Sequence, residues 1–358
     1  MAGLGMSDIV AAFRGRRVLI TGDTGFKGAW LSFLLTEAGA EVCGFALPAA
    51  ERASFPLLGL AERTHHFDGD IRDADAVKQA FSQWQPEFLF HLAAQPLVRL
   101  SYAEPKMTFD TNVAGSVNVL EAVRETASLR SVVYVTSDKC YKNREWVFGY
   151  RETDELGGHD PYSASKAVAE LVFSSYTDSF FVRMPHLGVA SARAGNVIGG
   201  GDWSADRIVP DSITALQQNQ PIRLRNPRAT RPWQHVLEPL CGYILLAIRL
   251  GENPQRYSGA WNFGPRADSV RPVQDLSEQI VREWGSGEVV VTTEANAPHE
   301  AGLLQLNCDK SYHLLNWKPR WEFERTVRET VAWYREVNDA ASAVAVTRRQ
   351  IHEYLESN

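Results

Sequence analysis

The chain has 358 residues, of which 44% are hydrophobic and 22% are charged, and its formal net charge is −6 at pH 7. These values are typical of a globular enzyme with one large domain or two closely joined domains, and they argue against broad electrostatic binding to nucleic acid. The four cysteines lie far apart without C-x-x-C spacing, so we expect reduced thiols and a cytoplasmic location. The first 13 residues lack a signal-peptide pattern, and the longest apolar run, around residues 244–248, is too short to span a membrane.

A glycine-rich turn follows the first predicted strand, residues 17–21. The turn reads TGDTGFKG over residues 21–28, and apolar residues at helical spacing come directly after it. Gly22, Gly25 and Gly28 let the backbone turn tightly, approach a pyrophosphate and pack a helix against the strand. Because the triplet lies between a first strand and a first helix, it predicts a dinucleotide site.

The second predicted strand, residues 41–46, departs from the usual dinucleotide pattern. An acidic residue for the ribose hydroxyls is expected near its end, but the chain reads FALP over residues 45–48. The first charged residues beyond it are Glu51 and Arg52. They favour different cofactors, because an acidic residue suits the ribose hydroxyls of NAD and an arginine suits the 2′-phosphate of NADP. This feature leaves the choice of cofactor open.

Strands and helices continue to alternate up to about residue 195. Asp70 and Ile71 lie in a loop that could flank an adenine, although Asp73 is equally suited to cap an ordinary helix. Residues 88–94 predict another buried strand with small residues at its end, and residues 107–126 predict a long helix. The alternation predicts an α/β fold with a mainly parallel, doubly wound sheet of the Rossmann type.

Three reactive side chains follow the strand predicted at residues 132–135. They are the hydroxyl of Ser137, the carboxylate of Asp138 and the amine of Lys139. An acid and a base at adjacent positions, beside a redox site, are what an elimination needs and a simple hydride exchange does not. The alternative is that Asp138 and Lys139 form a surface ion pair.

Tyr162 and Lys166 lie four residues apart on a helix predicted over residues 162–173. This spacing puts both side chains on one face of the helix. A lysine next to a tyrosine favours the phenolate, so the pair can take a proton from a hydroxyl near neutral pH. The same spacing also occurs by chance on solvated helices.

The chain changes in character after Arg193. Residues 196–203 predict a loop, and the four arginines within residues 222–231 suit either phosphate oxygens or a solvated surface. Residues 261–264 predict a late strand, and residues 324–336 and 347–356 predict terminal helices. The histidines lack chelating spacings, so we expect no catalytic metal.

Four segments resemble the extended short-chain dehydrogenase/reductases that act on nucleotide sugars, and within them the CDP-glucose 4,6-dehydratase group. They are GDTGFKGAWL at 22–31, HLAAQPLVRLSY at 91–102, TSDKCYKNREWVFGYRETDELGGHDPYSASK at 136–166 and ARAGNVIGGGDWSADRIVPD at 192–211. The resemblance covers about residues 15–357 and implies a bound NAD that is reduced and reoxidised within one turnover. It also implies a CDP-4-dehydro-6-deoxy-glucose product and a place in deoxysugar biosynthesis, such as that of the lipopolysaccharide O-antigen.

The resemblance assigns a role to each of the five reactive residues. Tyr162 takes the proton of the C4 hydroxyl, Lys166 holds the nicotinamide ribose and lowers the Tyr162 pKa, and Ser137 hydrogen-bonds the C4 oxygen. Asp138 protonates the leaving C6 hydroxyl and Lys139 takes the C5 proton. Dehydratases acting on dTDP-glucose usually have Thr-Asp-Glu where this chain has Ser137-Asp138-Lys139, so Lys139 is a departure from them that suits the CDP-sugar subfamily.

The resemblance also implies the binding residues and the domains. For the cofactor they are Gly22, Thr24, Gly25, Phe26, Lys27, Gly28, Asp70, Ile71, Leu92, Ala93, Ala94, Thr111, Thr136, Tyr162 and Lys166. For the nucleotide sugar they are Gln95, Asn196, Arg207, Arg231, Asn262 and, more weakly, His299. We expect residues 10–195 with about 232–264 to form the NAD-binding domain, and residues 196–231 with about 265–358 to bind the nucleotide sugar.

Relatives pair two long helices per subunit, which implies a homodimer through about residues 106–126 and 161–179.

Two other functions remain open from the sequence. A nucleotide-sugar 4-epimerase, or a dehydratase for another NDP-hexose, would use the same fold and cofactor, although an epimerase has no need of the acid and base at 138 and 139. A catalytically silent NAD-binding scaffold could lose Ser137, Tyr162 or Lys166 without penalty, yet this chain has them all.

Overall fold

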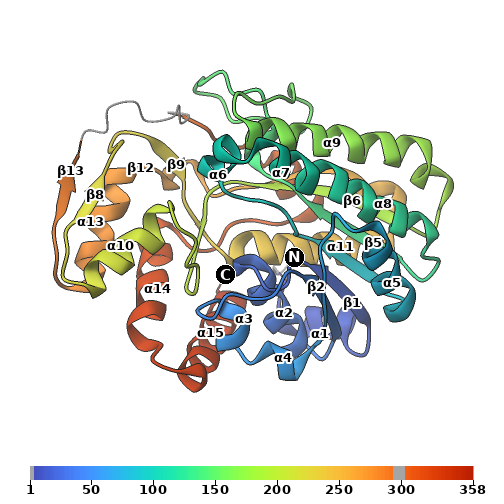
Figure 1. Ribbon diagram of the computed structural model, residues 1–358, viewed down its shortest axis with the longest axis horizontal. Coiled ribbons are helices and arrows are strands. Elements are labelled where there is room, and N and C mark those ends of the chain that lie inside the picture. Colours follow the sequence, from blue (N-terminus) through green and yellow to red (C-terminus); the bar gives the residue numbers. More distant parts are fainter. Residues whose placement is uncertain (1–3, 293–302, 358) are drawn as a thin grey trace.

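A parallel sheet of seven strands forms the centre of the molecule (Figure 1). The computed structural model describes residues 4–292 and 303–357. The strand order is β11-β6-β5-β4-β1-β2-β3, and every neighbouring pair runs parallel. The strands are β1 Arg17–Thr21, β2 Glu41–Ala46, β3 His65–Asp68, β4 Phe88–His91, β5 Ser131–Val135, β6 Gly188–Ala194 and β11 Gly259–Phe263. The predicted doubly wound Rossmann sheet is therefore confirmed, and its order reverses between β1 and β4, where a ligand crevice is expected.

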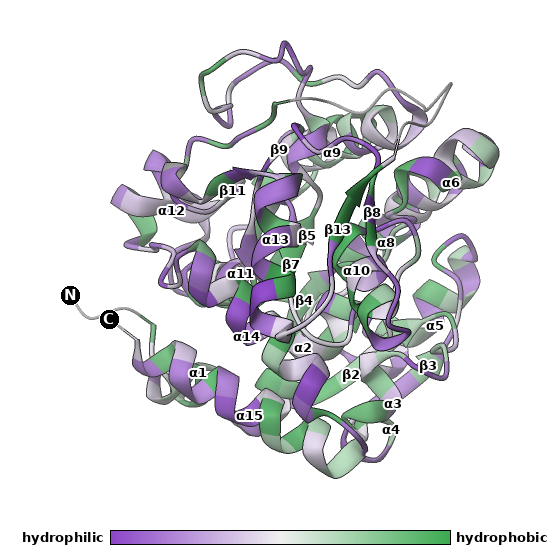
Figure 2. Ribbon diagram, turned by 90° about the vertical axis from the view of Figure 1, so that its left-hand side faces the viewer, coloured by the Kyte–Doolittle hydropathy of each residue, from purple (hydrophilic) through white to green (hydrophobic). Residues whose placement is uncertain are grey.

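Helices cover both faces of this sheet because successive strand residues point to opposite sides. Val18 and Ile20 of β1 pack in one cluster with α1, α2 and α11, whereas Leu19 packs in a second cluster with α5, α8 and α9. These helices are α1 Met6–Phe13, α2 Phe26–Glu37, α5 Ala74–Trp84, α8 Ser116–Glu125, α9 Pro161–Ser179 and α11 Leu237–Glu252. Hydrophobic colouring accordingly gathers on central strands such as β4 and β5 (Figure 2).

Smaller elements build a second unit at one end of the sheet (Figure 1). Three two-stranded pairs join β7 with β10, β9 with β12 and β8 with β13. The elements are β7 Val197–Ile198, α10 Ile208–Gln217, β8 Ile222–Leu224, β9 Thr230–Pro232, β10 Gln234–His235, β12 Val270–Pro272, α13 Val273–Trp284 and β13 Val289–Val291. Helix α14 Phe323–Glu336 packs against α13, and α15 Ala340–Glu356 reaches α2 of the main sheet layer through the ion pair of Arg348 with Glu37. The remaining short elements are α3 Ser54–Leu57, α4 Leu60–Arg63, α6 Val98–Ala103, α7 Pro105–Phe109, η1 Asp110–Gly115, η2 Asp138–Cys140, η3 Phe181–Arg183, α12 Pro254–Tyr257, η4 Ala267–Ser269 and η5 Ser311–Leu315.

The long helix predicted at residues 107–126 is present but interrupted. The chain passes from α7 through the π-helical segment η1 into α8. Gly115 lies against Ile71, where an added Cβ would meet the Ile71 side chain at 2.7 Å, and Asn112 turns inward to hydrogen-bond the backbone of Gln95. A π segment of this kind often marks a functional site.

The other predicted elements differ from the structure mainly at their ends. The strand predicted at 88–94 ends at His91, the helix predicted at 347–356 already begins at Ala340, and the loop at 196–203 contains the short strand β7. Asp73 does cap α5, with its side chain accepting hydrogen bonds from the backbone of Asp75 and Ala76. Across residues 4–292 and 303–357, no helix combines the length and the apolar character that crossing a membrane requires.

Candidate active site

A cavity of about 2250 Å³ lies where the central strands end and the smaller unit begins. The loops after β1, β3, β4, β5 and β6 contribute to its wall. Most of the residues expected to bind cofactor or substrate line it: Gly22, Thr24, Gly25, Phe26, Lys27, Gly28, Asp70, Ile71, Leu92, Ala93, Ala94, Gln95, Thr111, Thr136, Ser137, Asp138, Lys139, Tyr162, Lys166, Asn196, Arg207 and Arg231. The fold therefore gathers segments that are more than 200 residues apart in the chain around one space.

The glycine-rich loop has a shape that fits a dinucleotide. Gly22 has a φ of +77°, and an added Cβ would lie 2.8 Å from the backbone nitrogen of Ala93. A Cβ on Gly28 would lie 2.0 Å from the carbonyl oxygen of Gly22, so the helix packs closely onto the turn. Helix α2 begins directly after Gly25, and its amino terminus faces the loop where a pyrophosphate would be stabilised.

Positive charge is concentrated beside this loop. Burial lowers the pKa of Lys27 to about 8, and the nearby Arg207 and Lys166 lower it further, whereas Asp138 opposes the shift. Burial likewise lowers the pKa of Lys166 to about 8. Such a site gains by binding a negatively charged ligand, because the ligand compensates for cations that burial makes costly.

The residues that bear on cofactor choice lie at the end of β2. Leu47 lines the cavity there, and its backbone oxygen accepts a hydrogen bond from Thr24 Oγ1 at 3.0 Å. Neither Glu51 nor Arg52 lines the cavity, so neither of them decides between NAD and NADP in this arrangement. Asp70 reaches the cavity, but its carboxylate pairs with the Arg72 guanidinium at 2.5 Å.

Tyr162 and Lys166 lie in the first turns of α9 and are both buried. The helix begins here because Asp160 accepts a hydrogen bond from the Ser163 backbone and Pro161 occupies the first turn. Burial raises the pKa of Tyr162 to about 12, and the hydrogen bond with Ser137 opposes this only in part. Removal from water therefore outweighs the neighbouring groups that favour the phenolate, and the expected lowering of the Tyr162 pKa by Lys166 stays a prediction.

Asp138 and Lys139 lie in the 3-10 turn η2 after β5, and Ser137 caps this turn. Ser137 Oγ accepts a hydrogen bond from the Lys139 backbone at 3.2 Å and donates one to Asp138 Oδ1 at 3.0 Å. Asp138 is buried, and its Oδ2 has no hydrogen-bond partner among the described residues. Burial raises the Asp138 pKa, although the positive charges of Lys139, Arg231 and Lys27 act in the opposite direction.

This environment favours a proton on Asp138, because an unpaired buried carboxylate is costly. The alternative of a surface ion pair with Lys139 does not fit, since Asp138 is only 3% exposed. A carboxyl group whose pKa is raised by burial is better suited to act as a general acid.

The predicted substrate residues differ in where they lie. Arg231 on β9 and Asn196 reach the cavity, and Arg207 reaches it while pairing with Asp202 at 2.9 Å. Gln95 lines the cavity, but its side-chain amide donates hydrogen bonds to Thr108 Oγ1 at 2.9 Å and to the Leu97 backbone oxygen.

Asn262 does not line the cavity. It is fully buried in β11, where its side chain accepts a hydrogen bond from the Tyr141 hydroxyl at 2.8 Å and donates to the backbone of Tyr150 and Asn307. Its predicted substrate contact is therefore incompatible with this arrangement, because all of its polar atoms are used within the protein. His299 lies outside the described residues.

Three residues next to the site were not identified from the sequence. Asn112 joins the Gln95 loop to Ser165 of α9 through a 2.9 Å hydrogen bond. Glu170 and Arg193 form a buried ion pair of 2.7 Å behind the cavity wall. Glu170 could have been suspected, since it follows Lys166 at helical spacing, but nothing in the sequence marks Asn112 or Arg193.

No cluster of three or more histidine, cysteine, aspartate or glutamate residues suited to a metal ion occurs in the described ranges. The four cysteines, Cys43, Cys140, Cys241 and Cys308, are free and buried.

Comparison with known proteins places the chain among the nucleotide-sugar dehydratases. It is 45% identical over 348 residues to the CDP-glucose 4,6-dehydratase of Salmonella typhimurium, covering 96% of this chain and 97% of that protein. It is 26% identical over 340 residues to dTDP-glucose 4,6-dehydratase 1 of Escherichia coli, covering 89% of this chain and 92% of that protein. A dTDP-glucose 4,6-dehydratase structure from Streptomyces venezuelae with NAD bound has a TM-score of 0.76 at 25% identity and covers 89% of this chain and 97% of its own.

The fold extends to epimerases as well. The structure of UDP-glucose 4-epimerase from Thermus thermophilus with NAD has a TM-score of 0.76 at 24% identity, covering 89% of this chain and 99% of that one. The family model described as GDP-mannose 4,6 dehydratase matches residues 19–330. With this match over most of its length, and with the Salmonella relative at 45% identity, the chain belongs to the GDP-mannose 4,6-dehydratase family of the extended short-chain dehydrogenase/reductases.

Proposed function

We propose that the chain is a CDP-glucose 4,6-dehydratase, a hydro-lyase that converts CDP-D-glucose into CDP-4-dehydro-6-deoxy-D-glucose. The observation that carries the reaction type is the position of Asp138 and Lys139 on the same cavity as Tyr162 and Lys166. The substrate follows from the 45% identity to the Salmonella enzyme across nearly the whole of both chains. An epimerase would need Tyr162 and Lys166 but would not need the acid and base at positions 138 and 139.

NAD is the proposed cofactor, and when bound it accepts the hydride from C4 of the sugar and returns it to C6. Relatives of this fold have been crystallised with NAD, and the cradle formed by Gly22 and Gly28 suits a dinucleotide. The residues proposed to hold it are Gly22, Thr24, Gly25, Phe26, Lys27, Gly28, Asp70, Ile71, Leu92, Ala93, Ala94, Thr111, Thr136, Tyr162 and Lys166.

Tyr162 takes the proton of the C4 hydroxyl in the first step, while the Ser137 hydroxyl donates a hydrogen bond to the C4 oxygen. Burial raises the Tyr162 pKa, but the positive charge of Arg207 acts in the opposite direction and favours the phenolate during this step. The ammonium of Lys166, one turn further along α9, steadies the phenolate and holds the cofactor ribose.

The second step is the loss of water across C5 and C6. A ketone at C4 acidifies the C5 hydrogen, which Lys139 removes, and Asp138 gives its proton to the C6 hydroxyl as that group leaves. Hydride then arrives at C6 and a proton returns to C5, so the sum of the steps is the loss of one water molecule. The unpaired Oδ2 of buried Asp138 supports the acid role, because a protonated carboxyl needs no partner cation.

The nucleotide end of the substrate is proposed to lie against the smaller unit. Arg231 and Arg207 would neutralise the diphosphate, and Asn196 would contact the sugar or phosphate oxygens. We propose the corresponding division of the chain into residues 10–195 with about 232–264 for the cofactor and residues 196–231 with about 265–358 for the nucleotide sugar. This division is supported by the arginines that line the cavity from the smaller unit.

We also propose a homodimer through the helices at about 106–126 and 161–179. Exposed apolar side chains on these segments support it, namely Phe109 at 37% and Leu171 at 58% exposure. The four free buried cysteines support a reducing, cytoplasmic location.

The proposal is tested with a panel of CDP-, dTDP-, UDP- and GDP-hexoses incubated with the purified enzyme and NAD. CDP-glucose is expected to lose the mass of one water and to give the alkali absorbance of a 4-keto sugar. A product of unchanged mass from CDP-glucose, or water loss from another nucleotide sugar alone, would refute the assignment.

A further inference from the structure

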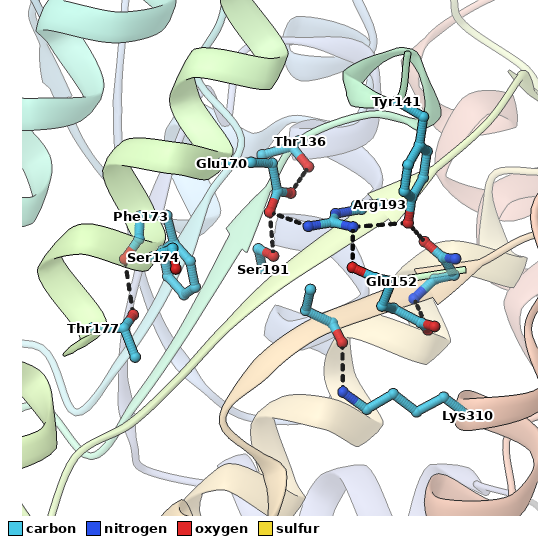
Figure 3. Close-up of polar contacts among 12 residues, drawn as sticks. Thr136, Tyr141, Glu152, Glu170, Phe173, Ser174, Thr177, Ser191, Arg193 and Lys310 are labelled. Atoms are coloured by element: carbon cyan, nitrogen blue, oxygen red, sulfur yellow. Dashed lines mark hydrogen bonds and ion pairs between the residues drawn. The ribbon is translucent and has the colours of Figure 1, made fainter. Parts of the chain in front are cut away.

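A network of buried polar side chains lies directly behind the wall that carries the catalytic groups (Figure 3). Glu170 of α9 accepts a hydrogen bond from Thr136 Oγ1 at one carboxylate oxygen and from Ser191 Oγ, at 2.8 Å, at the other. The Arg193 guanidinium of β6 donates to the second oxygen at 2.7 Å. The Glu170 and Arg193 side chains are 2% and 4% exposed, so water does not screen their interaction.

The other side of the Arg193 guanidinium faces Tyr141. Its Nη1 donates to the Tyr141 hydroxyl at 2.8 Å and to the Glu152 backbone oxygen at 3.1 Å. The Tyr141 hydroxyl in turn donates to Asn262 Oδ1 at 2.8 Å. Because the guanidinium is planar with donors in fixed directions, it holds Glu170 and Tyr141 in one geometry.

These contacts hold both ends of the catalytic turn. Thr136 comes directly before Ser137, and Tyr141 follows the turn that carries Asp138 and Lys139. One ion pair therefore anchors the turn on each side.

The same ion pair also reaches the redox residues. Glu170 lies on α9, one helical turn after Lys166 and two turns after Tyr162. The pair consequently joins the helix that bears the redox groups to the turn that bears the acid and the base.

We infer that Glu170 and Arg193 are positioning residues that set the distance between the redox groups and the elimination groups. The inference rests on the proposed function. It adds that the Glu170–Arg193 ion pair couples the two steps of that function, which are cofactor reduction and loss of water. Apolar replacement of a whole buried ion pair is often neutral for stability, whereas removal of one partner alone destabilises the fold, so each variant is first checked for folded protein. Catalytic geometry, by contrast, is sensitive, because a shift of about 1 Å can slow a step by about 10²-fold.

Arg193→Lys and Glu170→Gln test the inference. Lysine keeps the charge but loses the planar fork, so it cannot hold Glu170 and Tyr141 together. With NAD and CDP-glucose, both variants are expected to form reduced cofactor at close to the wild-type rate but to lose water about 10²-fold more slowly. The 4-keto form of CDP-glucose, still carrying its C6 hydroxyl, should then accumulate and be seen by mass and by the absorbance of the reduced cofactor.

Glu238→Gln is the matched control. Glu238 is also a fully buried carboxylate, bonded to Tyr354 and to the backbone of Arg320 and Trp321, but it does not line the cavity. This variant is expected to keep the wild-type ratio of cofactor reduction to water loss. A changed ratio in Glu238→Gln as well would overturn the inference, because any buried carboxylate would then have the same effect.

If Arg193→Lys and Glu170→Gln do not fold, Tyr141→Phe tests the positioning role instead. It removes one hydroxyl and leaves Glu170 and Arg193 paired, and it is expected to shift the ratio in the same direction. If folded variants keep the wild-type ratio while the wild type dehydrates CDP-glucose, the positioning role is refuted and the proposed function stands. If the wild type itself does not dehydrate CDP-glucose, the proposed function fails first.

Discussion

The acid role of Asp138 gives a prediction whose size follows from its surroundings. Asn has the same shape, so Asp138→Asn removes the proton donor while the Ser137 hydroxyl can still donate to the side-chain oxygen. A positioned general acid contributes about 10²–10⁴-fold to the step it serves. This corresponds to about 3–5 kcal/mol of transition-state stabilisation.

The loss of folding stability in Asp138→Asn should be smaller than this loss of transition-state stabilisation. Oδ2 of Asp138 has no partner among the described residues, and the amide nitrogen of Asn would stand in its place. An unsatisfied buried donor costs about 1–3 kcal/mol, which thermal melting would detect as a modest loss of stability. A loss of activity without a matching loss of folded protein can therefore be assigned to the chemistry.

The assay follows the two steps separately after CDP-glucose is added to the enzyme with NAD. Asp138→Asn should reduce the cofactor at close to the wild-type rate and then stall, so that reduced cofactor and the 4-keto-glucose species accumulate. Tyr162→Phe is the comparison, since it should stop the reaction before any cofactor is reduced. If Asp138→Asn blocks cofactor reduction as completely as Tyr162→Phe, Asp138 does not act as the acid.

Four further predictions follow from the site and the core. Because no acid follows β2 at the cavity, NAD should bind more weakly than in relatives that have one, by about 1.5–3 kcal/mol for a charge-assisted hydrogen bond, and stronger binding of NADP in calorimetry would contradict the cofactor assignment. Arg231→Ala should raise KM for CDP-glucose strongly and Arg231→Lys should restore it only in part, because the bidentate fork is lost; an unchanged KM in the Ala variant would remove Arg231 from the site. Lys139→Ala should still reduce NAD but should not exchange the C5 hydrogen of the 4-keto intermediate with deuterium oxide, and exchange at the wild-type rate would exclude Lys139 as the base. Burial raises the pKa of Glu238 from 4.5 to about 7, so between these pH values the folded state binds more protons than the unfolded state. The free energy of unfolding should therefore fall as pH rises through this window, by about 3 kcal/mol at 1.36 kcal/mol per unit. Glu238→Gln should flatten this pH dependence in chemical unfolding, and an equal slope in both proteins would refute the explanation.

Local patterns were enough to predict most of the fold. The strands at 17–21, 41–46 and 132–135 are short apolar segments, and the glycine-rich turn at 21–28 lies where it joins a strand to a helix, so each was recognisable without knowledge of the rest. Ser137, Asp138 and Lys139 line the same cavity as Tyr162 and Lys166. In a parallel sheet the ends of successive strands meet at one edge, so the order of motifs along the chain already implies their proximity.

Contacts between distant segments could not be predicted in this way. Asn262 was expected at the substrate from the family resemblance, but β11 lies at the edge of the sheet beside β6, and there its side chain meets Tyr141 instead. The Glu170–Arg193 ion pair exists only once α9 and β6 lie against each other. The pKa of Tyr162 depends on burial by the whole surrounding structure, which the spacing to Lys166 does not report.

The central claim, that one bound cofactor carries hydride from C4 to C6 while water is lost, is tested most directly with CDP-glucose deuterated at C4. The account predicts a product that is lighter by one water, carries the deuterium at C6 and, in ordinary water, gains an ordinary proton at C5. In deuterium oxide, unlabelled substrate should give a product with deuterium at C5 and none at C6. Deuterium retained at C4 in a product of unchanged mass, or lost to solvent without appearing at C6, would contradict the account.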